Sequence, residues 1–235
     1  MCPWVKISSM GNFFGKIIIA LLIAGVGIYG YLEYKNYQNN QSPDESNPTD
    51  KRVVEIAPGV EAEIEGNLVP RISADALKSA KLPDFGRIPK APKEMSQEIG
   101  DKFISKLNAS IEAVKADPTS YGDWIDIGIY RKILDDYEGA KEIWAFLVKA
   151  APDVATAYVN LGNLYAYYLH DNKKAEQLFL DGIDVAPRWK ESYDRAVDFY
   201  VVVTKEPEKA KLLLVKYSAK YPDMKPYLDS LALKI

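Results

Sequence analysis

A period of 34 to 35 residues runs through the second half of this chain and constrains its fold more than any other feature. Proline, alanine and bulky hydrophobic residues all recur with this period, at Pro152, Pro187 and Pro222, at Ala140, Ala175 and Ala210, and at Trp144, Phe179 and Leu214. Pro118 lies 34 residues before the first of these prolines. A unit of this length holds two helices and a turn, which cannot bury their apolar face alone. The period therefore predicts helical units that stack on one another.

The residues within each unit indicate which repeat is present. They follow the order W-x2-L-G-x2-Y…A-x3-F…P in three copies. The copies contain Trp124, Ile127, Gly128, Ala140, Trp144 and Pro152; Tyr158, Leu161, Gly162, Tyr165, Ala175, Phe179 and Pro187; and Tyr193, Ala196, Val197, Tyr200, Ala210, Leu214 and Pro222. This pattern resembles the tetratricopeptide repeat (TPR) family over about residues 121–222. Arg131 departs from it, because the first copy should have Tyr there, and Val197 replaces the small Gly of the third copy.

The resemblance implies an all-α fold, a TPR helix–turn–helix solenoid over residues 96–235. Its three repeats are expected at about 121–154, 155–189 and 190–224. Apolar residues with helical spacing predict flanking capping helices at 96–116 and 225–235. Each proline is expected to end a helix pair, because it cannot donate the next backbone hydrogen bond. A generic helical bundle is the alternative, but it would not keep proline and alanine in phase through three units.

An apolar stretch near the N-terminus is the second informative feature. Residues 17–32 contain no charged side chain, and the 20 residues from 13 to 32 would span about 30 Å as a helix. A buried core helix is the alternative, although it would be isolated from other folded elements. No small-x-small cleavage site follows in a polar context. We therefore predict an uncleaved transmembrane signal-anchor helix at 13–34, after a short cytoplasmic N-terminus at 1–12.

The residues on either side of this span predict its orientation and a tether. Lys6 and Lys16 lie on the N-terminal side, whereas acidic residues follow the span. The positive-inside tendency predicts a single-pass protein of the cell (inner) membrane with an extracytoplasmic TPR domain. Residues 35–95 are rich in Pro, Asn and Ser and are expected to form a flexible linker. Within this linker, 53–56 and 60–64 have the pattern of a short hairpin.

Composition argues against several classes of function. With 30 basic and 33 acidic residues, the chain has no basic field for nucleic acid. It contains one Cys and one His, and a metal site would need more such ligands. His170 is therefore interpreted as a turn residue. No glycine-rich phosphate loop or nucleophile elbow is present, so we expect no enzyme activity and no cofactor.

The resemblance also implies a partner-binding groove along the first helix of each repeat. The groove positions that we single out are Ile125, Ile129, Val159, Asn163, Tyr167, Asp194 and Asp198. Chaperone-binding TPR domains clamp a C-terminal carboxylate with Lys and Asn, but Ile125 and Ile129 stand at those sites here. In the alternative interpretation Ile125, Ile129 and Val159 simply pack between repeats.

The main functional hypothesis is a membrane-tethered, non-catalytic TPR scaffold that binds a protein or peptide ligand at the extracytoplasmic face. This layout resembles that of small bacterial envelope TPR proteins with one N-terminal span. One alternative is a non-catalytic regulatory subunit of an envelope biosynthesis or secretion complex. Another is a purely structural, self-associating spacer. We also expect the fragment from Glu94 to Ile235 to fold alone.

Overall fold

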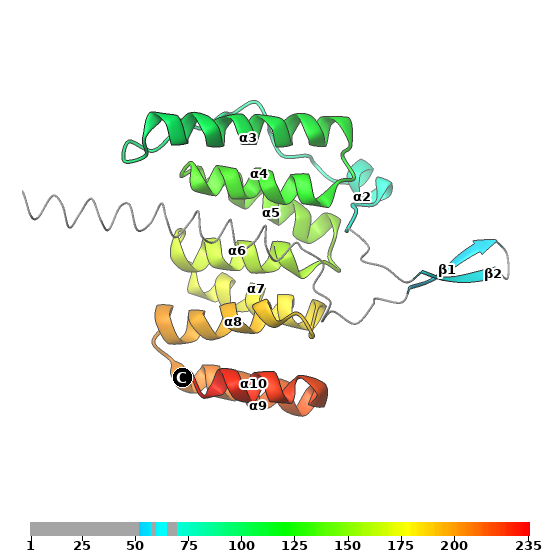
Figure 1. Cartoon of the computed structure of the whole chain (residues 1–235), viewed down its shortest axis with the longest axis vertical. Helices are drawn as coiled ribbons and strands as arrows, with labels where there is room; N and C mark the ends of the chain where they lie inside the picture. The colour runs from blue at the N-terminus through cyan, green and yellow to red at the C-terminus, as the bar shows by residue number, and fades with distance from the viewer. Residues whose placement is uncertain (1–51, 58–59, 65–69) are drawn as a thin grey trace, which may run out of the picture. The chain divides into compact units, whose positions relative to one another are not determined.

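The computed structural model describes residues 52–57, 60–64 and 70–235 (Figure 1). Two compact units are present, and the helical array belongs to the one formed by Val69–Ala91 and Gly100–Ile235. The predicted membrane span at 13–34 and the N-terminus at 1–12 lie outside the described residues. In the part of the chain that is described, no helix is both long and apolar enough to cross a membrane.

The hairpin expected in the linker is confirmed. Strands β1 (Arg52–Ala57) and β2 (Val60–Ile64) pair antiparallel, with Val54 opposite Ala62. The register shifts between Glu55 and Ala57, next to the turn. The all-α expectation therefore holds for the repeat array, and the hairpin is an exception to it in the other unit.

Three helix pairs follow one another with the predicted period. The pairs are α4 (Tyr121–Ile133) with α5 (Tyr137–Ala150), α6 (Ala155–Tyr167) with α7 (Asn172–Val185), and α8 (Lys190–Asp198) with α9 (Pro207–Lys220). Helix α3 (Gln97–Ala116) precedes them, and the 3-10 turn η2 (Pro222–Met224) and α10 (Lys225–Ala232) follow. Figure 1 shows α4, α6 and α8 side by side, with α5 and α7 behind them. The predicted helix–turn–helix array is therefore present.

One hydrogen bond recurs in every repeat and explains why aromatic residues and prolines share a period. In each case an aromatic side chain at the start of the first helix donates to the carbonyl of a proline six residues earlier. The bonds join Trp124 Nε1 to Pro118 (2.9 Å), Tyr158 Oη to Pro152 (3.1 Å) and Tyr193 Oη to Pro187 (2.8 Å). Each repeat is thus fastened to the turn that precedes it.

The turn within each repeat has a residue with left-handed backbone conformation two positions before the second helix. These residues are Asp135 (φ 58°), His170 (φ 53°) and Lys205 (φ 59°). In the first two repeats the next residue, Asp136 or Asp171, caps the second helix by accepting a backbone N–H bond. His170 is therefore a turn residue, as predicted.

Compared with the first repeat, the second and third repeats each have one more residue between the middle of the first helix and the start of the second. They accommodate it in different ways. The second lengthens the turn between α6 and α7, whereas the third ends its first helix with a π-helical segment, η1 (Phe199–Val203). A π-helical turn inserts one residue without breaking the helix. The helix pair of the third repeat can therefore stay in phase with its neighbours.

Close packing within a repeat depends on a small residue opposite a large one. A Cβ at Gly128 would lie 2.2 Å from Trp144 Nε1, and one at Gly162 would lie 2.9 Å from Phe179 Cε1. In the third repeat the equivalent residues are Val197 and Leu214, and both are buried in one core cluster. The larger residue on the first helix is thus accompanied by a smaller one on the second.

Residues 70–91, which we call the strap, differ from the flexible linker expected over 35–95. They contain the short helix α2 (Ala74–Ser79) and contact the array. Ile72 is 1% exposed, and its N–H donates to the Thr119 carbonyl at 2.9 Å. Arg71 pairs with Asp117 at 2.7 Å. The linker prediction needs this correction because a few apolar and charged contacts order the strap, although it contains three prolines and many charged residues.

Candidate partner-binding surface

Three of the predicted groove residues are not available to a partner. Ile125, Ile129 and Val159 are only 0%, 7% and 3% exposed. Branched apolar side chains fill the space between closely packed helices, and their burial stabilises the array. For these three residues the structure supports the alternative, packing within the array, and the prediction that they line a groove is wrong.

The predicted acidic residues are close to the C-terminal helix. Burial, and next a hydrogen bond with Asp194, raise the pKa of Tyr227 on α10. Asp198 remains exposed, and partial desolvation raises its pKa while Arg195 and Lys234 act in the opposite direction. Asp194 therefore interacts with the chain's own last helix, so the acidic positions do not form an open groove with the apolar ones.

Asn163 and Tyr167 do reach the surface of α6. Asn163 is half-buried, and Tyr167 is 41% exposed. They lie four residues apart on one helix and therefore on the same face. These are the two predicted residues that the structure leaves in a position suited to a ligand.

Aromatic and cationic side chains also occur where the first helices end and the second helices begin. We call this set the tyrosine edge, and it comprises Lys132, Tyr137, Tyr165, Tyr167, Tyr168 and Lys174. The Tyr137 and Tyr168 rings are 4.6 Å apart between centroids. Lys132 Nζ lies 6.0 Å from the centre of the Tyr168 ring, and Lys174 Nζ lies 5.0 Å from that of Tyr165. The edge thus joins residues from the first two repeats.

The turn geometry determines the chemistry of the tyrosine edge. Asp135, in the left-handed turn position, accepts a 2.6 Å hydrogen bond from Tyr137 Oη. Burial, and then Asp135, raise the pKa of Tyr137, so its phenol stays neutral. A hydrogen bond with Asp171 raises the pKa of Lys174. The surface therefore combines neutral aromatic rings with cations, a composition that suits protein interfaces.

Sequence reasoning identified only one member of this edge, Tyr167. The available signal was the density of tyrosine, with 16 in the chain and three within residues 165–168. The partner of Tyr168 is Tyr137, which lies in a different repeat. A groove drawn only along the first helices does not include that residue.

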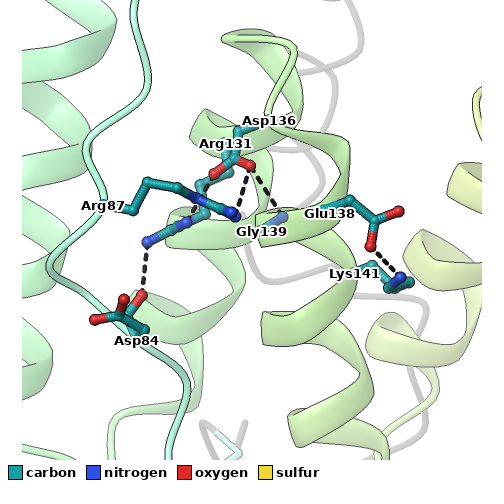
Figure 2. A network of polar contacts seen from close by, with 7 residues as sticks. All are labelled: Asp84, Arg87, Arg131, Asp136, Glu138, Gly139 and Lys141. Carbon is teal, nitrogen blue, oxygen red and sulfur yellow. Dashed lines mark hydrogen bonds and ion pairs between the residues drawn. The ribbon is translucent and has the colours of Figure 1, made fainter.

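A buried ion pair forms a second polar centre, at the turn between the two helices of the first repeat (Figure 2). Arg131 is 1% exposed, and its Nη1 bonds Asp136 Oδ2 at 2.7 Å. Its Nη2 donates to the Asp84 carbonyl of the strap at 2.9 Å. Arg87, also from the strap, pairs with the other oxygen of Asp136 at 2.8 Å. The departure from the TPR pattern at Arg131 therefore gives the repeat a buried contact with the strap.

The surroundings of this pair are tightly packed. Gly139 N–H donates to Asp136 Oδ1 at 3.0 Å, and a Cβ at Gly139 would lie 2.3 Å from Arg131 Nη1. The strap also places Phe85 5.2 Å from the Trp124 ring. The contacts with Asp136 and Arg131 leave no room for a side chain at Gly139. The centre is structural and stabilises the strap on the first repeat.

Metal chemistry finds no support in the described part of the chain. No group of three or more His, Cys, Asp or Glu residues is arranged there to hold a metal ion. The sequence-based expectation of no metal and no cofactor stays a prediction for the whole chain.

Comparison with known proteins shows only distant likeness. No family model matches this chain, and no curated protein does. Two crystal structures of MamA are similar to it, the first at 19% identity and a TM-score of 0.42 over 52% of this chain. The second has 21% identity and a TM-score of 0.40 over 55% of this chain and 77% of its own length. This chain spans 65% of the length of the first.

Likenesses of this strength carry no argument about function. The fold assignment rests instead on features of the chain itself: the stacked helix pairs, the left-handed turns and the aromatic donors bound to proline carbonyls. These features give the described array a TPR-like helical repeat fold.

Proposed function

We propose that this protein is a non-catalytic scaffold that binds a protein or peptide partner through the tyrosine edge. The observation that carries the proposal is the close, tilted pair of the Tyr137 and Tyr168 rings, with Lys132 over the Tyr168 ring. Tyr167, which precedes Tyr168 in the sequence, is 41% exposed. Tyrosine contributes a large apolar face and a hydrogen-bonding hydroxyl at a low cost in conformational entropy. Such residues dominate binding energy at protein interfaces.

Asn163 adds specificity for a polypeptide. It lies one helical turn before Tyr167, and its amide has both a donor and an acceptor that match a peptide backbone. Lys132 and Lys174 favour a partner with acidic residues beside its aromatic or apolar contacts. The partner class that fits best is therefore a peptide segment with apolar and acidic side chains.

The proposal also includes a membrane tether and an extracytoplasmic location for the array. Support for both comes from the sequence, namely the uncharged stretch at 17–32 and the lysines before it. Alkaline carbonate extraction tests the tether, because an integral protein stays with the membrane. Protease added from outside the cytoplasm tests the location and should release the array by cutting within residues 42–69.

Affinity capture with the full-length chain tests the binding surface. Proteins captured by the wild type are identified by mass spectrometry and compared with those captured by Tyr137→Ala with Tyr168→Ala. Lys149→Ala, at an exposed position on α5, is the control. We expect the double variant to lose a protein that both wild type and control retain. Equal capture by all three would rule out the tyrosine edge as the binding surface.

A further inference from the structure

Helix α9 has an apolar stripe on the side opposite its core contacts. Leu212 and Val215 are 69% and 68% exposed, and Ala219 is exposed one turn later. Their spacing of three and four residues places them on one face of the helix. The buried residues of α9, such as Leu214 and Tyr217, lie on the other side. The stripe therefore does not contribute to the core of the array.

The repeat pattern does not require this stripe. Leu212 corresponds to Gln177 on α7 and Glu142 on α5, which lie 35 and 70 residues earlier. Ala219 corresponds in the same way to Asp184 and Lys149. All four of these equivalent residues are exposed and polar. Leu212 and Ala219 are thus apolar only in the last repeat. The position of Val215 is also apolar in the earlier repeats, as Leu180 and Ala145, but those two residues are partly buried whereas Val215 is 68% exposed.

Charge distinguishes the same helix from the others. Helix α9 contains one acidic residue and four lysines, Lys209, Lys211, Lys216 and Lys220, in a chain whose net charge is −3. In every other described helix the acidic residues equal or outnumber the basic ones. Lys211 and Lys216 are adjacent to Leu212 and Val215 in sequence and lie on either side of the stripe.

Local ion pairs do not cancel this cationic character. Lys211 pairs with Glu208 at 2.9 Å and Lys209 with Glu206 at 3.1 Å. These side chains are 43% exposed or more, and ion pairs between exposed groups contribute little to stability. The lysines can therefore exchange these partners for external anions at small cost.

We infer that the outer face of α9 docks on an anionic lipid surface. Leu212 and Val215 enter the boundary between headgroups and acyl chains, while Lys211 and Lys216 bind lipid phosphates. An amphipathic helix with an apolar stripe and flanking lysines has the chemistry of an interfacial membrane helix. A second copy of this chain fits less well, because a stable dimer buries about 800 Å² on each partner, far more than this short stripe offers. The inference is independent of the tyrosine edge and of the predicted span.

A fluorescent probe next to the stripe tests this contact in the full-length chain. Cys2 is first replaced by Ser, since it is the one native cysteine. Ala219→Cys is then labelled with a nitrobenzoxadiazole group, whose emission increases when it leaves water. Lys149→Cys, labelled in the same way, provides the matched control at the equivalent position of α5. Each protein is examined in vesicles of phosphatidylcholine alone and of phosphatidylcholine with phosphatidylglycerol.

We expect a several-fold increase in emission at position 219 in the phosphatidylglycerol vesicles, and no increase at position 149. Adding Leu212→Gln and Val215→Asn should abolish the increase without loss of helical circular dichroism, because both side chains are exposed. Adding Lys211→Gln and Lys216→Gln should remove the dependence on phosphatidylglycerol.

Three outcomes would overturn the inference. The first is no change at position 219 in either vesicle, and the second is an equal change at position 149. The third is an increase that depends on protein concentration without vesicles, which would indicate self-association.

Discussion

Two arginines bind the same carboxylate in very different surroundings, and this gives a sharp test of the role of burial. Arg131 and Arg87 both pair with Asp136, at 2.7 and 2.8 Å. The Arg131 side chain is 1% exposed, whereas that of Arg87 is 51% exposed. Replacing each by Met keeps a similar stem and removes only the guanidinium. The two sites differ in solvent exposure and in the bond from Arg131 to the Asp84 carbonyl, which burial also protects from water.

The expected losses differ severalfold. Removing one partner of a buried pair costs about 3–5 kcal/mol, because the remaining charge loses its compensation. For Arg131→Met we expect the lower end of this range, since Asp136 keeps Arg87 and the Gly139 N–H. An exposed pair is worth about 0.2–1 kcal/mol, which is the loss expected for Arg87→Met. Total stability of a domain is about 5–15 kcal/mol, so the first loss is a large part of it.

Urea unfolding followed by circular dichroism measures both losses. Hydrogen exchange adds a local readout at the Ile72 amide, which is bonded to Thr119 within the strap contact. Arg131→Met should accelerate exchange there, because the Asp84 carbonyl loses its donor and the strap opens. Arg87→Met should leave this exchange nearly unchanged. Equal free energies of unfolding for the two variants would refute the argument from burial.

Three further predictions concern the array. Burial, and then Asp123, raise the pKa of Asp126 from 3.8 to about 6, so folding favours the protonated form and stability falls as pH rises from about 4 to 6. Asp126→Asn should therefore raise the melting temperature at pH 7 by an amount equivalent to roughly 1–2 kcal/mol, with no gain at pH 4. Gly128→Ala should lower stability by about 1–3 kcal/mol in urea unfolding, since the new Cβ meets Trp144. The fragment 70–235 should melt at a higher temperature than 94–235, because only the longer one contains the strap; equal melting would contradict this.

The repeat architecture was predictable because it depends on local and periodic signals. Proline, alanine and aromatic residues recur in phase, and the bonds from Tyr158 and Tyr193 to proline carbonyls show the physical basis of that recurrence. The left-handed position of His170 likewise follows from a short turn before a capping aspartate. Signals of this kind span a few residues and survive in the sequence pattern.

The partner surface was harder to predict because it depends on contacts between distant residues. Arg131 stood out as a departure from the pattern, but its partner Asp84 lies 47 residues earlier, outside the repeats. Ile125 looked equally suited to a groove and to packing, and only the positions of neighbouring helices decide between these. Asp194 seemed open until α10 placed Tyr227 beside it.

The strap also determines how the array responds to a pull on the chain before residue 70. Arg71 bonds Asp117 and Thr119, and the Ile72 N–H bonds the Thr119 carbonyl. These contacts close a loop between residues 48 positions apart in the sequence. Tension from the N-terminal side therefore passes through these contacts directly to the start of the first repeat. The residues between them, 73–118, do not carry it. If the Arg71 contacts break first, the enclosed residues can extend and lengthen the chain in front of the array while α4 to α10 stay folded.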